Sequence, residues 1–117
     1  MKIYAVDDTH EFRRMYEMLL DAKTFHGPDI LIPYMKLERP DILICDLVLD
    51  GTSGWNVVRE VRELFPNMPI IIATSCDEEI QKQFAKHRNL GYWFKSQDLE
   101  KLRNLVEEMS CTKPIEK

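Results

Sequence analysis

Short apolar runs alternate along this chain with longer stretches in which apolar residues recur every three or four positions. The runs at residues 2–6, 42–47, 70–74 and 92–94 are nearly continuous in apolar residues, as is typical of strands buried on both faces. Helical spacing occurs at Phe12, Met15, Tyr16, Leu19 and Leu20, at Val58, Val61, Leu64 and Phe65, and at Leu99, Leu102, Leu105, Val106 and Met109. This alternation indicates βαβ units. We therefore expect an α/β domain in which helices cover both faces of a five-stranded parallel sheet, with right-handed crossovers.

Two segments are harder to interpret. The letters PDILI occur at residues 28–32 and again at 40–44, and the second copy leads into the strand at 42–47. The first copy is either an edge strand, with Pro33 starting a short helix, or a helix that contains Pro33. Residues 78–90 form a mostly polar stretch with Ile80, Phe84 and Leu90 as apolar anchors, so we expect a well-solvated helix there.

Composition restricts the class of protein. The 117 residues are 44% hydrophobic and 31% charged, and the formal net charge is -4, which suits one soluble domain. Sixteen basic against twenty acidic residues give no basic excess for direct nucleic-acid binding. Without a membrane-length apolar run or a secretory signal, the chain is expected to be cytoplasmic and to make no membrane contact. Three cysteines without CxxC spacing favour reduced thiols, with Cys45 as a small buried hydrophobe.

Polar residues stand where the predicted strands end. They are Asp7, Asp8, Asp46, Thr74 and Lys95. Ligands of an open parallel sheet bind outside the carboxyl ends of its strands, so these side chains are expected at one rim. The acidic pair alone has another interpretation, because aspartate is also a common helix N-cap.

Three carboxylates at one rim resist joint ionisation unless a cation neutralises them. Mg²⁺ prefers oxygen ligands, and no His or Cys is placed to favour zinc. With a metal bound, one carboxylate can attack phosphorus and form an aspartyl phosphate. Lys95 and the Thr74 hydroxyl would then compensate charge on the phosphoryl oxygens.

The ordered set of motifs resembles the receiver domain of two-component response regulators, of the chemotaxis-regulator type. It consists of Asp7-Asp8, PDILICDL with Asp46, GTSG with Gly54, IIIATS with Thr74 and GYWFK with Lys95. The resemblance spans nearly the whole chain, so residues 1–117 are expected to form a single receiver domain. It implies a flavodoxin-like doubly wound sheet of strand order 2-1-3-4-5. The short interval between Asp8 and Gly27 suggests a shortened second strand.

The resemblance also implies a role for each site residue. Asp46 would be the phosphoacceptor. Mg²⁺ would be bound directly by Asp8 and Asp46, largely through water by Asp7, and by the backbone carbonyl of Val48. Thr74 and Lys95 would act with Asp46 in catalysis by binding the phosphoryl group, and Thr74 and Tyr92 would form the switch.

The implied function is that of a phosphoacceptor, which catalyses its own phosphorylation and dephosphorylation and is not a turnover enzyme. A histidine kinase or phosphotransfer protein would donate the phosphoryl group. The surface of the fourth helix, fifth strand and fifth helix would then switch toward a downstream protein target. The same surface allows a homodimer.

Three residues depart from the pattern of the family. Asp50 and Ser96 stand where proline is usual, the second of them a cis proline, and Ser75 stands where Ala or Gly is usual. These departures favour an alternative function, a non-phosphorylated pseudo-receiver that serves as a protein interaction or dimerisation module. The letters LVLDGT also resemble a haloacid-dehalogenase-type phosphatase motif, but Val48 occupies its nucleophile position, which argues against that enzyme class.

Overall fold

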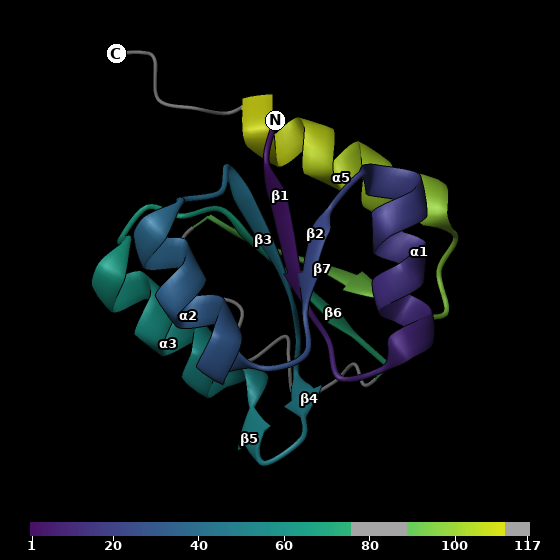
Figure 1. The fold of residues 1–117 in the computed structure, drawn as a ribbon. Helices are drawn as coiled ribbons and strands as arrows, with labels where there is room; N and C mark the ends of the chain where they lie inside the picture. Colours follow the sequence, from purple (N-terminus) through teal and green to yellow (C-terminus); the bar gives the residue numbers. More distant parts are fainter. Residues whose placement is uncertain (76–88, 112–117) are drawn as a thin grey trace.

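Five parallel strands form the central sheet of the computed structural model, which describes residues 1–75 and 89–111 (Figure 1). The strands are β1 (Ile3–Val6), β2 (Lys23–Phe25), β3 (Ile42–Asp46), β6 (Ile70–Thr74) and β7 (Leu90–Phe94). Their order is β2-β1-β3-β6-β7, which confirms the predicted order 2-1-3-4-5 once the strands of this sheet are counted along the chain. Every residue of β1, β3 and β6 is buried, in keeping with their continuous apolar sequences.

Helices cover both faces of the sheet. Figure 1 shows α2 (Pro28–Leu37) and α3 (Gly54–Leu64) on one side, and α1 (His10–Leu20) and α5 (Leu99–Cys111) on the other. Successive strand residues serve opposite faces. Tyr4 and Val6 therefore pack in the α2–α3 core, whereas Ile3 and Ala5 pack in the α1–α5 core. Each strand is thus fixed from above and below, and its carboxyl end is held in register.

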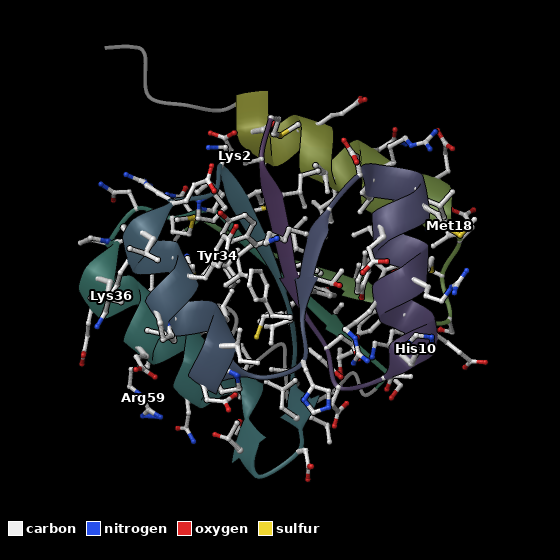
Figure 2. All side chains as sticks on the ribbon, viewed as in Figure 1. Lys2, His10, Met18, Tyr34, Lys36 and Arg59 are labelled. Atoms are coloured by element: carbon white, nitrogen blue, oxygen red, sulfur yellow. The ribbon has the colours of Figure 1, made fainter. Side chains whose placement is uncertain are left out.

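The first PDILI segment is helical, which confirms the second of the two alternatives, a helix that contains Pro33, and rules out an edge strand. Pro28 begins α2, where the absent proline N–H costs no hydrogen bond, and Pro33 lies within the helix. Leu31, Ile32 and Met35 are the buried residues of α2, a spacing that places them on one helical face. Tyr34 also lies between α2 and the sheet, where its ring contacts those of neighbouring aromatic residues (Figure 2).

The shortened second strand is confirmed: β2 has only three residues. It follows α1 after a two-residue link. Asp21 adopts a left-handed conformation with φ of 54° and ends the helix, and the N–H of Ala22 donates to the carbonyl of Tyr16. This tight connection accounts for the short interval between Asp8 and Gly27.

The last strand begins earlier than predicted. The run at 92–94 extends back to Leu90, which pairs with Ile70 in the parallel register of β6 and β7. Leu90 is therefore a strand residue and does not end the predicted helix at 78–90. Residues 78–88 of that predicted helix lie outside the described residues.

A two-stranded antiparallel hairpin follows β3 and was not predicted. It consists of β4 (Val48–Leu49) and β5 (Thr52–Ser53), and in Figure 1 it projects beyond the carboxyl ends of the sheet strands. Within the described parts of the chain, no helix combines the length and the apolar character needed to cross a membrane.

Candidate functional site

Asp7 directly follows β1 and is anchored by its backbone and by its side chain. Its N–H donates to the carbonyl of Phe25 at 3.1 Å, and its carbonyl accepts from Nη1 of Arg13 at 2.8 Å. Its Oδ1 accepts from the backbone N–H of Thr9 at 2.9 Å. Asp7 is fully buried, whereas Asp8 is partly exposed. The acidic pair thus follows a fixed strand end, and the buried carboxylate also orders the entry into α1.

Asp46 ends the neighbouring strand β3 and is 5% exposed. Its Oδ1 accepts from the N–H of Val48 at 3.2 Å. The first residue of α3, Gly54, packs directly on the backbone of Asp46: a Cβ at position 54 would lie 2.1 Å from the Asp46 carbonyl oxygen. Its N–H donates to the carbonyl of Leu47 at 2.7 Å. A glycine is therefore required here for α3 to approach the strand that carries Asp46.

The β4–β5 hairpin connects Asp46 at the end of β3 to Gly54 at the start of α3. Its turn consists of Asp50 and Gly51, and Gly51 has a φ of +82°, which glycine adopts without steric cost. The hairpin ends at Ser53, whose Oγ caps α3 by accepting from the N–H of Trp55 at 3.1 Å. Asp50, which replaces the usual proline, thus lies in a tight exposed turn that an Asp-Gly pair suits.

The three aspartates converge as the sequence predicts. One oxygen from each of Asp7, Asp8 and Asp46 lies within 4.8 Å of the others. Burial, and then the Asp7 carboxylate, raises the pKa of Asp46, and Lys95 and the Val48 N–H offset this only in part. Among the described residues, the buried Oδ2 of Asp7 receives no hydrogen bond, and its charge is met only by an ion pair with Lys95 at 2.9 Å. Convergent, hard and under-compensated oxygens are a donor set that suits Mg²⁺.

Lys95 brings a cation into this acidic cluster. Its Nζ lies 2.9 Å from Oδ2 of Asp7 and 3.2 Å from Oδ2 of Asp46. Its backbone N–H donates to the carbonyl of Thr74 at 2.8 Å, which joins the end of β7 to the end of β6. The ammonium also lies over the ring of Phe12, 4.2 Å from its centroid. The lysine therefore contacts both carboxylates and an aromatic face of α1.

The turn after this lysine is held without proline. The peptide bond before Ser96 is trans, as are all those of the described residues. The N–H of Gln97 donates to the carbonyl of Phe94 at 2.8 Å, and its side-chain oxygen accepts from the N–H of Phe94 at 3.0 Å. The indole N–H of Trp93 donates to the carbonyl of Asp98 at 3.0 Å. These contacts close the turn between β7 and α5.

The remaining predicted residues lie around the cluster. Thr74 is buried at the end of β6, one residue beyond the pair formed by Asp46 and Ala73. Val48 is 66% exposed, and its backbone reaches Asp46. Tyr92 is half-buried in β7, and its ring meets that of Phe94 edge-on at 5.0 Å.

Cys45 behaves as a buried hydrophobe, as predicted. Its side chain is fully buried, and its Sγ lies 3.4 Å from the Asp46 carbonyl oxygen. Burial raises the pKa of this thiol, and the carboxylates of Asp46 and Asp7 add to the effect. A raised pKa disfavours the thiolate and therefore a nucleophilic role.

Three residues at the site could not be identified from the sequence. The helical spacing marked Phe12 only as a core residue, and nothing marked Arg13 or Gln97. Each acts through a contact with a distant segment or with the backbone, as in the ring of Phe12 beneath Lys95. Helical spacing shows which face of a helix is apolar, but it does not show which side chain of another segment contacts that face.

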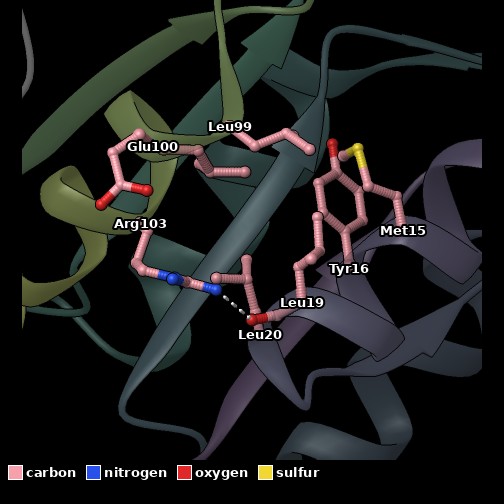
Figure 3. Close-up of a pocket in the computed structure, with 8 residues that line it drawn as sticks. Met15, Tyr16, Leu19, Leu20, Leu99, Glu100 and Arg103 are labelled. Atoms are coloured by element: carbon pink, nitrogen blue, oxygen red, sulfur yellow. Dashed lines mark hydrogen bonds between the residues drawn. The ribbon is translucent and has the colours of Figure 1, made fainter.

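A mostly apolar pocket lies away from the carboxylates, between α1 and α5. Figure 3 shows the ring of Tyr16 between the two helices, with Arg103 reaching the carbonyl of Leu19 at 3.4 Å. The space amounts to about 130 Å³. Its lining is Met15, Tyr16, Leu19, Leu20, Leu99, Glu100, Leu102 and Arg103. None of the acidic cluster contributes to it, so the two features are separate.

Comparison with known proteins supports the architecture and the motifs. Residues 3–107 match the family model of the response regulator receiver domain. A transcriptional regulatory protein of Escherichia coli O6:H1, BaeR, is 40% identical over 57 residues, which make up 49% of this chain and 23% of BaeR. The matched stretch thus spans less than a quarter of that relative. The comparisons do not support the alternative of a pseudo-receiver.

Solved structures share the fold. The chemotaxis protein CheY4 of Vibrio cholerae has a TM-score of 0.84 at 23% identity, covering 92% of this chain and 97% of that one. The response regulator TrrA of Thermotoga maritima, solved in complex with Mg²⁺–BeF, has a TM-score of 0.81 at 21% identity, with coverage of 92% and 97%. At these identities the likeness concerns the fold alone.

Proposed function

This chain belongs to the response regulator receiver domain family, and we propose that Asp46 is its phosphoacceptor. The phosphoryl group comes from a phosphohistidine of a histidine kinase or phosphotransfer protein in the cytoplasm. The observation that carries this proposal is the convergence of Asp7, Asp8 and Asp46 at one rim, with the Lys95 ammonium 3.2 Å from Oδ2 of Asp46. A nucleophilic carboxylate, a metal-binding acid pair and a cation are the parts that phosphoryl transfer needs.

The acidic cluster fits Mg²⁺. Asp8 and Asp46 would hold the ion directly, Asp7 largely through water, and the backbone carbonyl of Val48 would complete the protein ligands. When bound, the ion supplies positive charge that neutralises the carboxylates and the phosphoryl oxygens. The acidic cluster supports this role, because one Lys95 ammonium, 2.9 Å from Oδ2 of Asp7 and 3.2 Å from Oδ2 of Asp46, is the cation that these carboxylates share.

In the proposed step, a carboxylate oxygen of Asp46 attacks the phosphorus of the donor phosphohistidine. A phosphorus–oxygen bond forms as the phosphorus–nitrogen bond breaks. The nitrogen keeps the electron pair, and because the other ring nitrogen of the donor carries a proton, the histidine leaves as neutral imidazole. In dephosphorylation, a water molecule attacks the phosphorus, phosphate leaves, and the Asp46 carboxylate is restored. The domain therefore acts as a timed switch and not as a turnover enzyme.

Lys95 and Thr74 serve the transferred group. The Lys95 ammonium is anchored close to Asp46, where it would pair with a phosphoryl oxygen once charge develops there. The Thr74 hydroxyl would donate to another phosphoryl oxygen from the end of β6. Their backbones are joined by a 2.8 Å hydrogen bond, so a movement of one strand end is transmitted to the other.

The effect of phosphorylation would be transmitted from Thr74, beside the phosphoryl group, to Tyr92 on the neighbouring strand. As Thr74 moves toward the new dianionic group, Tyr92 turns into the space that it leaves. Tyr92 lies on β7 and is half-buried, so its ring is not locked in the core. The surface that β7 and α5 form with the predicted helix at residues 78–90, most of which lies outside the described residues, then changes its affinity for a downstream protein target or for a second copy of the chain.

Titration of the intrinsic tryptophan fluorescence tests this function. Mg²⁺ is added first and beryllofluoride, a phosphoryl mimic, second, with Asp46→Asn as the matched variant. We expect a saturable change that requires Mg²⁺ and is lost in Asp46→Asn. An unchanged signal in the wild type, together with no labelling by acetyl phosphate, would contradict the proposal.

A further inference from the structure

The Lys95 ammonium is held by an aromatic face as well as by two carboxylates. Phe12 is the third residue of α1, and its ring centroid lies 4.2 Å from Nζ of Lys95. On its other sides the ammonium meets Oδ2 of Asp7 at 2.9 Å and Oδ2 of Asp46 at 3.2 Å. The ammonium thus donates a hydrogen bond to Asp46, forms an ion pair with Asp7 and faces the ring of Phe12.

We propose that Phe12 is a positioning residue that holds the Lys95 ammonium at the carboxylates through a cation–π contact. The negative face of an aromatic ring attracts a cation within about 6 Å of its centroid, and it does so more strongly where water is excluded. The Lys95 side chain is only 11% exposed, so this contact is largely shielded from solvent. The ring also offers no hydrogen-bond acceptor that would draw the ammonium away from Asp46.

The residue after the lysine explains why such a contact matters in this chain. Ser96 lacks the ring with which proline would restrict the backbone at that point. Lysine has one of the most flexible side chains, so holding its ammonium in one place costs considerable conformational entropy. The hydrogen bond from the Lys95 N–H to Thr74 fixes the start of the side chain, and the Phe12 ring fixes its end.

If Phe12 had only a packing role, substitutions would act through the volume of its side chain and not through the electron density of its ring. Phe12 is half-buried and packs beside the α1–α5 core, with its ring 6.4 Å from that of Tyr16. Packing depends on the volume of the side chain, whereas the cation–π contact depends on the electron density of the ring face. Fluorination of the ring weakens the cation–π contact and changes the volume little.

The test combines a geometric readout with a kinetic one, because the kinetic part rests on the proposed function. The lysine ε-methylene protons of Lys95 are observed by NMR after labelling of lysine with ¹³C, and the signal is assigned with Lys95→Arg. Labelling of the protein by acetyl phosphate and Mg²⁺ is timed on the same samples. The variants are Phe12→Leu, Phe12→Tyr, and phenylalanine with one, two or three fluorines at position 12. Met15→Leu, on the same helix, is the packing control.

We expect an upfield ring-current shift of the Lys95 methylene protons in the wild type and in Phe12→Tyr, and its loss in Phe12→Leu. The labelling rate should fall about two- to fivefold in Phe12→Leu and in steps with each fluorine, and stay unchanged in Met15→Leu. An absent shift in the wild type, or equal rates across the fluorinated series, would overturn the inference. If the wild type takes no phosphoryl group, the proposed function fails, and the ring-current shift alone decides where Lys95 lies.

Discussion

The Lys95 ammonium lies 3.2 Å from Oδ2 of Asp46, a residue 49 positions earlier in the chain. The same ammonium reaches the fully buried Asp7. One cation thus partly compensates two carboxylates that would otherwise repel each other at close range. The lysine has a structural task in the protein without metal, in addition to its proposed catalytic one.

Removing this cation should destabilise the fold. We expect Lys95→Gln to lower the free energy of unfolding by about 3 kcal/mol at neutral pH in the presence of a chelator, because both buried carboxylates lose their partner. Mg²⁺ should restore much of the loss by supplying another cation. Urea unfolding with and without Mg²⁺ measures both effects. The exposed Lys101→Gln is the control, and equal stabilities of the two variants would contradict the assignment.

Neutralising Asp46 should have the opposite effect. Its pKa is raised from the ordinary value of 3.8, so the folded protein binds this proton more readily than the unfolded chain does. The stability contributed by the protonated form is complete below pH 3.8 and is lost as the pH rises through the folded value. Asp46→Asn should therefore be more stable than the wild type at neutral pH and gain little below pH 3.8. The expected gain is about 1 kcal/mol, the usual size for one stabilising substitution.

Urea unfolding across this pH range, without divalent cations, checks the prediction for Asp46. The exposed Asp50→Asn in the adjoining hairpin is the matched control, for which we expect no such pH-dependent gain. A wild type that is more stable than Asp46→Asn at neutral pH would show that the site favours the charged carboxylate.

Gly54 and Gly51 should respond differently to alanine. A Cβ on Gly54 would lie 2.1 Å from the Asp46 carbonyl oxygen and 2.6 Å from Cα of Leu47, so backbone must move. We expect Gly54→Ala to cost about 3 kcal/mol or more and to displace Asp46. A Cβ on Gly51 meets nothing within 4 Å, so Gly51→Ala should cost about 1–2 kcal/mol for its φ of +82° alone. Thermal unfolding compares the two, and equal costs would contradict the close packing at Gly54.

Gln97 should help to hold Lys95 in place, because its side chain closes the turn that follows this lysine. Gln97→Leu leaves the N–H of Phe94 without its side-chain acceptor, so we expect a loss of about 1 kcal/mol in unfolding free energy and slower labelling by acetyl phosphate. Gln97→Glu retains an acceptor oxygen and should stay close to the wild type in stability. If Gln97→Leu is as stable and as reactive as Gln97→Glu, the hydrogen bond to Phe94 does not support the turn.

The sheet and the acidic rim could be predicted from the sequence for one physical reason. Buried parallel strands are continuous in apolar residues, and their carboxyl ends meet at one edge, so Asp7 and Asp46 are expected at the same rim. That their strands are neighbours is implied only by the family resemblance. The sequence does not distinguish a helix from a strand at residues 28–37, because PDILI is a short apolar run that fits either element. The cation–π contact of Phe12 depends on tertiary geometry that no local pattern contains.

The hairpin between β3 and α3 shows a similar limit. In the family pattern Asp50 is a departure from the usual proline, but followed by Gly51 it forms an Asp-Gly pair, which is a strong turn signal. The strands on either side have two residues each, too few for an alternating pattern to be visible. Likewise, the closure of the turn after Lys95 by Gln97 joins a side chain to a backbone group, and residue periodicity does not report such a bond.

The most direct test of the central claim is to locate the phosphorylated residue. The protein is incubated with acetyl phosphate and Mg²⁺, the acyl phosphate is trapped with borohydride, and the reduced residue is mapped by mass spectrometry. Reduction converts a phosphorylated aspartate to homoserine, and we predict that this change occurs at Asp46, requires Mg²⁺ and disappears in Asp46→Asn. Homoserine at Asp7 or Asp8, or at no residue of a folded protein, would contradict the assignment of Asp46 as the phosphoacceptor.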